Sequence, residues 1–202
     1  MKTLTPGVYG LLQRIVHDDH WRSFGLFTRT LDLRPGETVV EIGCGIGSLA
    51  RHFAEQGFDY WGIDRDADRI ELARKRTPGG RYMAWNAMDL ENAGLPPFRR
   101  AFIHGVLHHL NDAECRDLIH YILGMRPDMT LSIIEPFRPN PWWINPLGTL
   151  FARLDEGLYI RTLEEWRALF RPNAVVFEQI SLWPRWPVGM LVARLVPTAS
   201  SR

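Results

Sequence analysis

A strand that runs directly into a glycine-rich turn constrains this chain more than any other feature. Residues 37–42 are mostly apolar or β-branched, and Gly43, Gly45 and Gly47 follow at alternate positions. Glycine lets the backbone bend sharply and approach a ligand without a Cβ in the way. Helical character returns over residues 48–56, so the turn leads into a helix N-terminus with free N–H groups. A tight turn without a ligand remains the simpler alternative.

Strands and helices alternate beyond this turn. The expected strands are 37–42, 60–63, 82–85, 101–105 and 130–134, and the expected helices are 9–33, 48–56, 67–75 and 112–123. Such alternation predicts parallel strands joined by helical crossovers, with helices on both faces of one sheet. Two later candidates, residues 175–182 and 189–195, predict an antiparallel hairpin at the sheet edge. Between them and the core, Thr162 and Glu165 have the spacing of a helix capping box.

An acidic residue, Asp64, ends the second expected strand about 20 residues after the glycines, where a carboxylate can accept both hydroxyls of an adenosine ribose. The turn and the acid together predict a dinucleotide or another adenosine cofactor. The glycines fall as GxGxG, with Ser48 where a dinucleotide fingerprint has its third glycine. Glu41 would repel a pyrophosphate but suits a ligand with sulfonium and ammonium groups. This charge pattern favours S-adenosylmethionine, and a nicotinamide-dependent oxidoreductase is the alternative.

Size and composition set the remaining bounds. The chain has 202 residues, of which 46% are hydrophobic and 23% charged, so a single domain with one core is expected. A net charge of +1 argues against a dedicated nucleic-acid binder, and two cysteines without a CxxC pair argue against a structural zinc site. The absence of a secretory signal or a membrane-spanning stretch favours a cytoplasmic location. We divide the domain into a helical cap (1–34), a cofactor-binding core (35–136) and a lid with edge strands (137–202).

Five segments resemble, in order, the motifs of class I S-adenosylmethionine-dependent methyltransferases, in the type 11/12-like branch that acts on small molecules. They are Val39–Gly47, Gly62–Asp64, Ile70–Arg74, Asn86–Leu90 and His104–Asp112. The resemblance implies a Rossmann-like α/β fold: a seven-stranded, mostly parallel sheet with helices on both faces and an antiparallel last strand. Two positions depart from the family pattern. Asn86 stands where Asp is usual, and Arg99-Arg100 occupy the region of a common acid.

The resemblance also implies which residues bind the cofactor. They are Tyr9, Glu41, Gly43, Gly45, Gly47, Asp64, Arg65, Asn86, Ala87 and His104. Glu41 and the glycines would line the methionine and ribose, and Asp64 would hold the ribose hydroxyls. Arg65 would flank the adenine, and Asn86 and Ala87 would contact its edge; the Asn86 carbonyl can still accept from the adenine amino group. The His104 backbone would accept from the ammonium group, and Tyr9 would close over the carboxylate.

Methyl transfer from a sulfonium is an in-line displacement, so the position of the acceptor atom supplies most of the acceleration. A general base helps when the acceptor carries a proton. His108 and His109 follow the fourth expected strand and Glu135 ends the fifth, which makes these three the candidate bases. The alternative is that the histidines are packed and hydrogen-bonded. The remaining histidines form no metal-binding pattern.

Residues 137–146 and 183–187 are rich in proline and tryptophan, and the prolines argue against a regular helix or central strand there. Trp142, Trp143, Trp183 and Trp186 would then lie in loops. They could form a lid over an apolar substrate together with Ile144 and Phe151, or they could pack against the sheet edge. A third alternative is peripheral contact with a membrane surface, in which Arg138, Arg153, Arg161 and Arg185 meet anionic head groups.

The leading hypothesis is methyl transfer to a small apolar or aromatic metabolite or lipid precursor, by a monomer or homodimer. A catalytically silent protein that binds the cofactor and serves as a partner or regulator is the non-enzymatic alternative.

Overall fold

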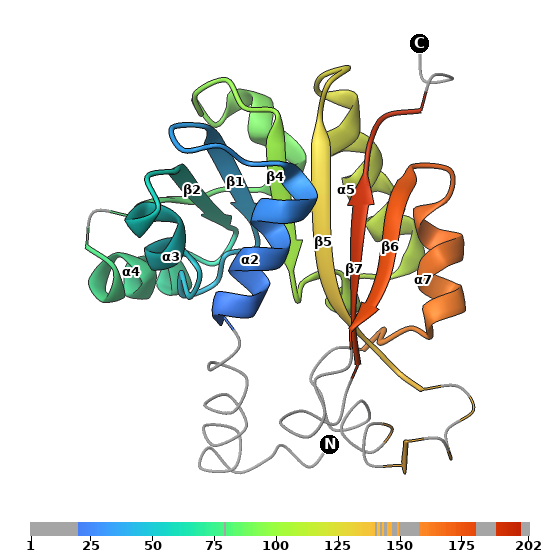
Figure 1. Cartoon of the computed structure of the whole chain (residues 1–202). Coiled ribbons are helices and arrows are strands. Elements are labelled where there is room, and N and C mark those ends of the chain that lie inside the picture. The colour runs from blue at the N-terminus through green and yellow to red at the C-terminus, as the bar shows by residue number, and fades with distance from the viewer. Residues whose placement is uncertain are drawn as a thin grey trace.

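A computed structural model describes residues 20–78, 80–139, 158–180 and 189–198, together with positions 141, 143, 145, 146 and 149. These residues form a seven-stranded sheet with the order β3-β2-β1-β4-β5-β7-β6 (Figure 1). The strands are β1 (Thr38–Ile42), β2 (Asp59–Asp64), β3 (Arg81–Ala84), β4 (Arg100–His104), β5 (Thr130–Phe137), β6 (Ala174–Ile180) and β7 (Gly189–Leu195). Strands β1 to β5 pair in parallel, and β7 is antiparallel to both of its neighbours. The predicted fold and its antiparallel last strand are confirmed.

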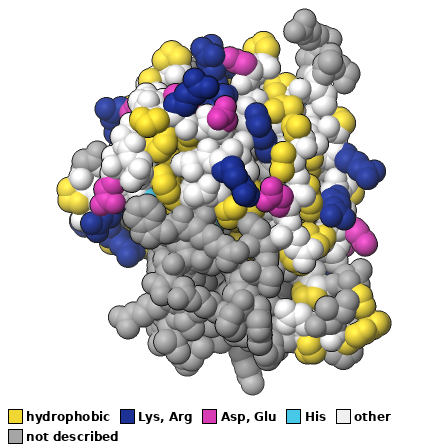
Figure 2. Space-filling view, in the orientation of Figure 1, with side chains coloured by type: hydrophobic (Ala, Val, Ile, Leu, Met, Phe, Trp, Pro, Cys, Tyr) yellow, Lys and Arg dark blue, Asp and Glu magenta, His cyan; other side chains and the backbone are white. Residues whose placement is uncertain are grey.

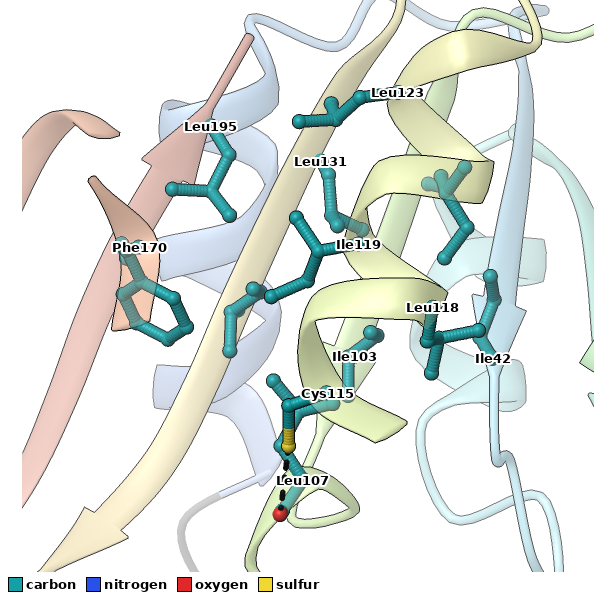
Figure 3. Packing of buried hydrophobic residues seen from close by; sticks show 14 of the residues in the cluster. Ile42, Ile103, Leu107, Cys115, Leu118, Ile119, Leu123, Leu131, Phe170 and Leu195 are labelled. Carbon is teal, nitrogen blue, oxygen red and sulfur yellow. Dashed lines mark hydrogen bonds between the residues drawn. The ribbon is translucent and has the colours of Figure 1, made fainter. Parts of the chain in front are cut away.

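Helices cover both faces of this sheet (Figure 1). On one face lie α2 (His20–Leu31), α3 (Ala50–Glu55) and α4 (Ala67–Arg76); on the other lie α5 (Asp112–Gly124) and α7 (Leu163–Phe170). On the α2 face, Phe27 and Phe53 pack against Phe102 of β4, with ring centroids 4.3 and 5.0 Å away. On the α5 face, Ile119 and Leu131 belong to one buried cluster, which is drawn in Figure 3. Each helix therefore buries one apolar face, as amphipathic patterning requires.

The helix starts follow from local side-chain chemistry. Thr162 accepts a hydrogen bond from the backbone N–H of Glu165, and the Glu165 carboxylate accepts one from the N–H of Thr162. This reciprocal pair is the predicted capping box, and it satisfies two backbone donors that a helix start otherwise leaves unpaired. Asn111 and Glu114 form a second box at the start of α5.

Strand β5 corrects one expectation. We expected regular structure to end before Pro136, but β5 continues through Pro136 and Phe137, both of which are buried. The reason is the pairing: β4 ends at His104, opposite Ile134, so the last part of β5 pairs only with β7. A proline that has no ladder partner on one side loses no hydrogen bond there. The prediction of an irregular chain was therefore wrong for these two residues.

Surface charge is mixed over the described part of the face that carries α2. Acidic side chains lie beside basic ones there, with apolar side chains between them (Figure 2). No helix among the described residues is long and apolar enough to cross a membrane. Of the expected helical cap at 1–34, the structure describes only the part from His20 onward.

Candidate functional site

A cavity of about 610 Å³ lies at the carboxyl ends of the parallel strands. Strand β1 lies between β2 and β4, and the chain, having added β2 and β3 on one side of β1, crosses from β3 to β4 on the other side. Such a crossover point is where open α/β sheets bind ligands. The cavity is lined by Ile42, Gly43, Ile63, Asp64, Arg65, Asp66, Arg69, Trp85, Asn86, Ala87, Met88, Gly105, Val106, His109, Leu110, Glu114, Asp117 and Leu118.

The three glycines after β1 all have positive φ, but the space that a Cβ would have differs among them. Gly43, at φ 74°, has no space for a side chain because a Cβ there would overlap Val106. A Cβ on Gly47 would lie 2.7 Å from the Tyr82 hydroxyl oxygen. A Cβ on Gly45 would meet no described atom within 4 Å. Packing against described side chains thus accounts for two of the glycines, whereas Gly45 has no described neighbour within that distance.

Asp64 connects the end of β2 to this turn. Its Oδ2 accepts a hydrogen bond from the backbone N–H of Gly45 at 2.8 Å, and its Oδ1 accepts one from the N–H of Asp66 at 2.9 Å. The carboxylate is mostly buried but lines the cavity. The predicted pair of acid and glycine turn is therefore in direct contact, and the carboxylate is held in one orientation.

The Glu41 side chain lies on the opposite face of β1 from Ile42, which lines the cavity. Its carboxyl group is buried and accepts a hydrogen bond from the Tyr60 hydroxyl, and the residue is not among those that line the cavity. Gly62 makes this contact possible, because a Cβ there would lie 2.8 Å from the Tyr60 oxygen. Burial raises the pKa of Glu41 to about 8; the Tyr60 hydrogen bond opposes this shift and the charge of Asp64 adds to it. Near neutral pH the free chain keeps a proton on this group.

The loop after β3 forms the opposite side of the cavity. The Asn86 side-chain oxygen accepts from the N–H of Met88 at 3.0 Å and so begins the short 3₁₀ helix η1 (Ala87–Asn92). The Trp85 indole donates to the Asp89 carbonyl oxygen at 2.8 Å. The structure thus brings Asn86 and Ala87 to the same cavity as Asp64, with Arg65 exposed at its rim.

The three candidate bases occupy different environments. Glu135 has no exposed surface; its Oε1 accepts from the N–H groups of Val106 and Leu107 at 2.8 and 2.7 Å, and its Oε2 lies 2.7 Å from His108 Nδ1. Burial by itself would raise the pKa of Glu135, but the charge of His108 and these hydrogen bonds lower it overall. His109 is exposed, lines the cavity and packs against the His108 ring at 4.1 Å. Of the three candidates, only His109 lines the cavity.

Other predicted residues lie elsewhere or outside the description. His104 Nε2 is 3.4 Å from the Ser23 hydroxyl, and its ring meets Phe27 edge-on at 5.8 Å; the residue does not line the cavity. Trp143 is 64% exposed. Other residues for which we predicted a role lie outside the described part of the chain: Tyr9, Trp142, Ile144, Phe151, Arg153, Trp183, Arg185 and Trp186.

Arg161 corrects the membrane hypothesis. This arginine is 5% exposed, and its guanidinium donates to Asp112 Oδ1 at 2.8 Å and lies over the Trp166 ring at 4.7 Å. A buried side chain that is bonded in this way cannot meet lipid head groups, so the proposed role of Arg161 there was wrong. Arg138 is half exposed and donates to Glu165.

Several residues of the site were not predicted. Tyr60, Trp85, Met88 and Leu110 were not predicted, and Arg161 was predicted only as a possible membrane contact. Met88 and Leu110 lie within the quoted motif segments, so those segments could have indicated them. Tyr60 and Arg161 reach their partners through the pairing of distant segments, for which the sequence carries no local signal. Among the described residues, no group of three or more His, Cys, Asp or Glu side chains could hold a metal ion.

Comparisons with known proteins agree with this geometry. Residues 39–125 match the model of a family described as a methyltransferase domain. The uncharacterized methyltransferase sll0829 of Synechocystis sp. is 26% identical over 157 residues, which cover 75% of this chain and 73% of that protein.

Two solved structures share the fold. Human N-acetylserotonin methyltransferase in complex with SAM has a TM-score of 0.66 at 17% identity, covering 92% of this chain and 56% of that one. Magnesium protoporphyrin IX methyltransferase from Synechocystis with bound SAH has a TM-score of 0.61 at 17% identity, covering 94% and 84%.

Proposed function

We propose that the chain is a class I S-adenosylmethionine-dependent methyltransferase, which its match to a methyltransferase-domain model over residues 39–125 supports, and that it transfers a methyl group to a small apolar or aromatic acceptor. The observation that carries the proposal is the contact between Asp64 and the Gly45 turn at the edge of a cavity of about 610 Å³. This arrangement offers a carboxylate for ribose hydroxyls next to a backbone that a ligand can approach closely.

The residues around the cavity fit S-adenosylmethionine, which supplies an electrophilic methyl group when bound. Asp64, which lines the cavity, would accept from the ribose hydroxyls. Gly45 is not itself a lining residue, but a Cβ there would meet no described atom within 4 Å, so a ligand could pass beside the turn. Asn86, Ala87 and Met88 would border the adenine. The Asn86 oxygen already accepts from Met88, but an amide oxygen has a second lone pair for the adenine amino group.

The chemistry requires the acceptor atom to be held in line with the methyl group, and positioning supplies most of the rate. If that atom carries a proton, His109 is suited to remove it, because it is exposed and lines the cavity. The buried pair of His108 and Glu135 fits a structural role, since Glu135 satisfies the N–H groups that begin the loop before His109.

Apolar side chains beside this loop support an apolar or aromatic acceptor. The N–H of Tyr159 donates to the His108 carbonyl at 2.9 Å, so Tyr159 and Leu158 lie next to the histidines. Leu158 is 77% exposed and Tyr159 is 41% exposed, which leaves apolar surface available to an acceptor. Two fold neighbours are named for N-acetylserotonin and for magnesium protoporphyrin IX, and at 17% identity they support the fold alone. A cytoplasmic location, a lid and a monomeric or homodimeric state stay predictions.

A thermal-shift assay tests the cofactor class. S-adenosylhomocysteine should raise the melting temperature, because a ligand that binds only the folded chain stabilises it, by about 2.7 kcal/mol at a hundredfold excess over Kd. NAD⁺ at the same concentration should leave it unchanged, since the turn lacks the third glycine of a dinucleotide fingerprint and has Ser48 at that position. A shift with NAD⁺ and none with S-adenosylhomocysteine would overturn the proposal.

Gly45 provides a second, local test. Gly45→Ala forces a Cβ onto a residue with φ 53° and should lower the free energy of unfolding by about 1–2 kcal/mol. Its methyl group would also occupy the space beside the turn and weaken the binding of S-adenosylhomocysteine. Gly36→Ala is the matched control, because Gly36 also has positive φ, 88°, and an open side, but precedes β1 at the other end of that strand. Calorimetry should show weaker binding for Gly45→Ala alone; equal affinity in both variants would contradict the assignment.

A further inference from the structure

The loop between β4 and α5 is held at both ends by buried charged groups. This loop, residues 105–111, contains the 3₁₀ helix η2 (Leu107–His109) and contributes His109 and Leu110 to the cavity. At its start, Glu135 accepts from the N–H groups of Val106 and Leu107. At its end, the carbonyl groups of Leu107 and Leu110 point to Arg161. An acid at the N–H end and a cation at the carbonyl end both complement the dipole of such a turn.

Arg161 makes an unusual number of contacts for one side chain. Its Nη1 donates to the carbonyl oxygens of Leu107 at 3.1 Å and Tyr159 at 3.2 Å, and its Nη2 donates to that of Leu110 at 2.8 Å. Its Nε donates to Asp112 Oδ1 at 2.8 Å, which neutralises the charge. The guanidinium plane lies over Trp166 of α7. The planar fork of an arginine spreads five N–H donors over three nitrogens and so reaches acceptors that lie apart, whereas the three donors of a lysine all lie on one nitrogen.

Cys115 of α5 holds the same carbonyl groups from another direction. Its thiol donates to the Leu107 oxygen at 3.3 Å (Figure 3) and lies 3.6 Å from the Leu110 oxygen. Burial raises the pKa of this thiol to about 12, although the nearby Arg161 opposes the shift, so the thiol stays a donor at neutral pH. The carbonyls on either side of His109 thus have partners on two elements, and Arg161 provides the charged one.

We propose that Arg161 is a positioning residue for the cofactor site: by binding the Leu107 and Leu110 carbonyls, it fixes His109 and Leu110 where they line the cavity. The inference rests on the proposed function, because it assigns the loop to the site of S-adenosylmethionine. Arg161 also links the segment at Tyr159 to this loop. The Tyr159 N–H donates to the His108 carbonyl, and the Tyr159 carbonyl accepts from Arg161. Arg161 itself touches neither cofactor nor acceptor in this account.

A purely structural role for Arg161 makes a different prediction. In that case the side chain would only hold α7 and the preceding turn to the rest of the protein, and its loss would lower global stability alone. Arg138 provides the comparison, because it holds the same region. It donates to the Ile160 carbonyl at 3.1 Å and to Glu165 at 3.0 Å, and none of these acceptors belongs to the loop.

The test compares Arg161→Lys with Arg138→Lys in the full chain. S-adenosylhomocysteine affinity is measured by calorimetry, amide hydrogen exchange is measured for residues 106–111, and thermal unfolding is recorded for each variant. Arg161→Lys should weaken binding roughly five- to thirtyfold and speed exchange at the N–H groups of His109 and Leu110, which close the 3₁₀ turn. Arg138→Lys should leave the Kd and the exchange rates within about twofold of those of the unsubstituted chain. If Arg161→Lys fails to fold, Asp112→Asn replaces it and should change both readouts in the same direction, because Asp112 orients the guanidinium.

The outcomes separate this inference from the proposed function. Unchanged loop exchange in Arg161→Lys, or an equal change in Arg138→Lys, would overturn the positioning role. Failure of the unsubstituted chain to bind S-adenosylhomocysteine would instead overturn the proposed function. The exchange comparison would still decide whether Arg161 holds the loop.

Discussion

Replacing Asp64 with alanine is expected to weaken S-adenosylhomocysteine binding by about 2–3 kcal/mol, which is roughly a hundredfold in Kd. The substitution removes the carboxylate proposed to accept the ribose hydroxyls. It also removes the acceptor for the N–H of Gly45, so the turn loses the bond that fixes it. Both effects reduce binding, and no neighbouring group on β2 can replace the carboxylate at that position.

Calorimetry with two further variants makes the Asp64 result specific. Asp64→Asn keeps one side-chain oxygen but loses the charge, so its Kd should lie between those of the other two proteins. Asp68→Ala is the control, because Asp68 is an exposed acid in the first turn of α4 and does not line the cavity. Thermal unfolding of each variant shows how much of the effect comes from the backbone N–H groups that lose their acceptor. A Kd for Asp64→Ala within about twofold of the unsubstituted chain would contradict the ribose assignment.

The second large effect concerns Glu41 and stability. Its pKa is about 8 in the folded chain, against an ordinary value of 4.5, because the group is buried. Between these two values the folded chain holds a proton that the unfolded chain has released. The free energy of unfolding should therefore fall as pH rises from about 5 to 8, by up to a few kcal/mol in total. The stabilising contribution is fully present below the unfolded pKa and is lost as pH rises through the folded pKa.

Urea unfolding at several pH values tests this effect. Glu41→Gln cannot titrate and should show a flatter dependence between pH 5 and 8, while Tyr60→Phe should retain or steepen it because the Tyr60 hydrogen bond lowers the pKa of Glu41. Glu164→Gln, an exposed substitution on α7, serves as the control. Glu135 does not contribute to the pH dependence of unfolding between pH 5 and 8. Its pKa is lowered on folding, so its contribution is lost only as pH falls below the ordinary range of a glutamate. Equal slopes for Glu41→Gln and the unsubstituted chain would contradict the assignment.

Local signals were sufficient for the architecture. The glycine turn after β1, the acid after β2 and the capping box at Thr162 each depend on residues a few positions apart, and each lies where we expected it. The expected strand ends differ from the observed ones by only a few residues, the largest difference being the extension of β5 to Phe137. The order of strands and helices then left few possible topologies, because parallel crossovers have a fixed hand.

The misses share a physical cause: each depends on how distant segments pair. Pro136 lies in a strand because β4 ends opposite Ile134, which only the register of the sheet determines. Glu41 faces Tyr60 because Gly62 leaves room between them. Arg161 is buried because residues far away in sequence, Leu107, Leu110 and Asp112, present oxygens to it. The residues near Arg161 in the sequence do not indicate that it has such partners.

The most direct test of the account is an experimental structure of the chain with S-adenosylhomocysteine. We predict the ribose hydroxyls on the Asp64 carboxylate and the adenine beside Asn86, Ala87 and Met88. The homocysteine part of the ligand should pass the Gly45 turn, where a Cβ would meet no described atom within 4 Å. A ligand bound elsewhere, with the cavity between Asp64 and His109 empty at saturating concentration, would contradict the central claim.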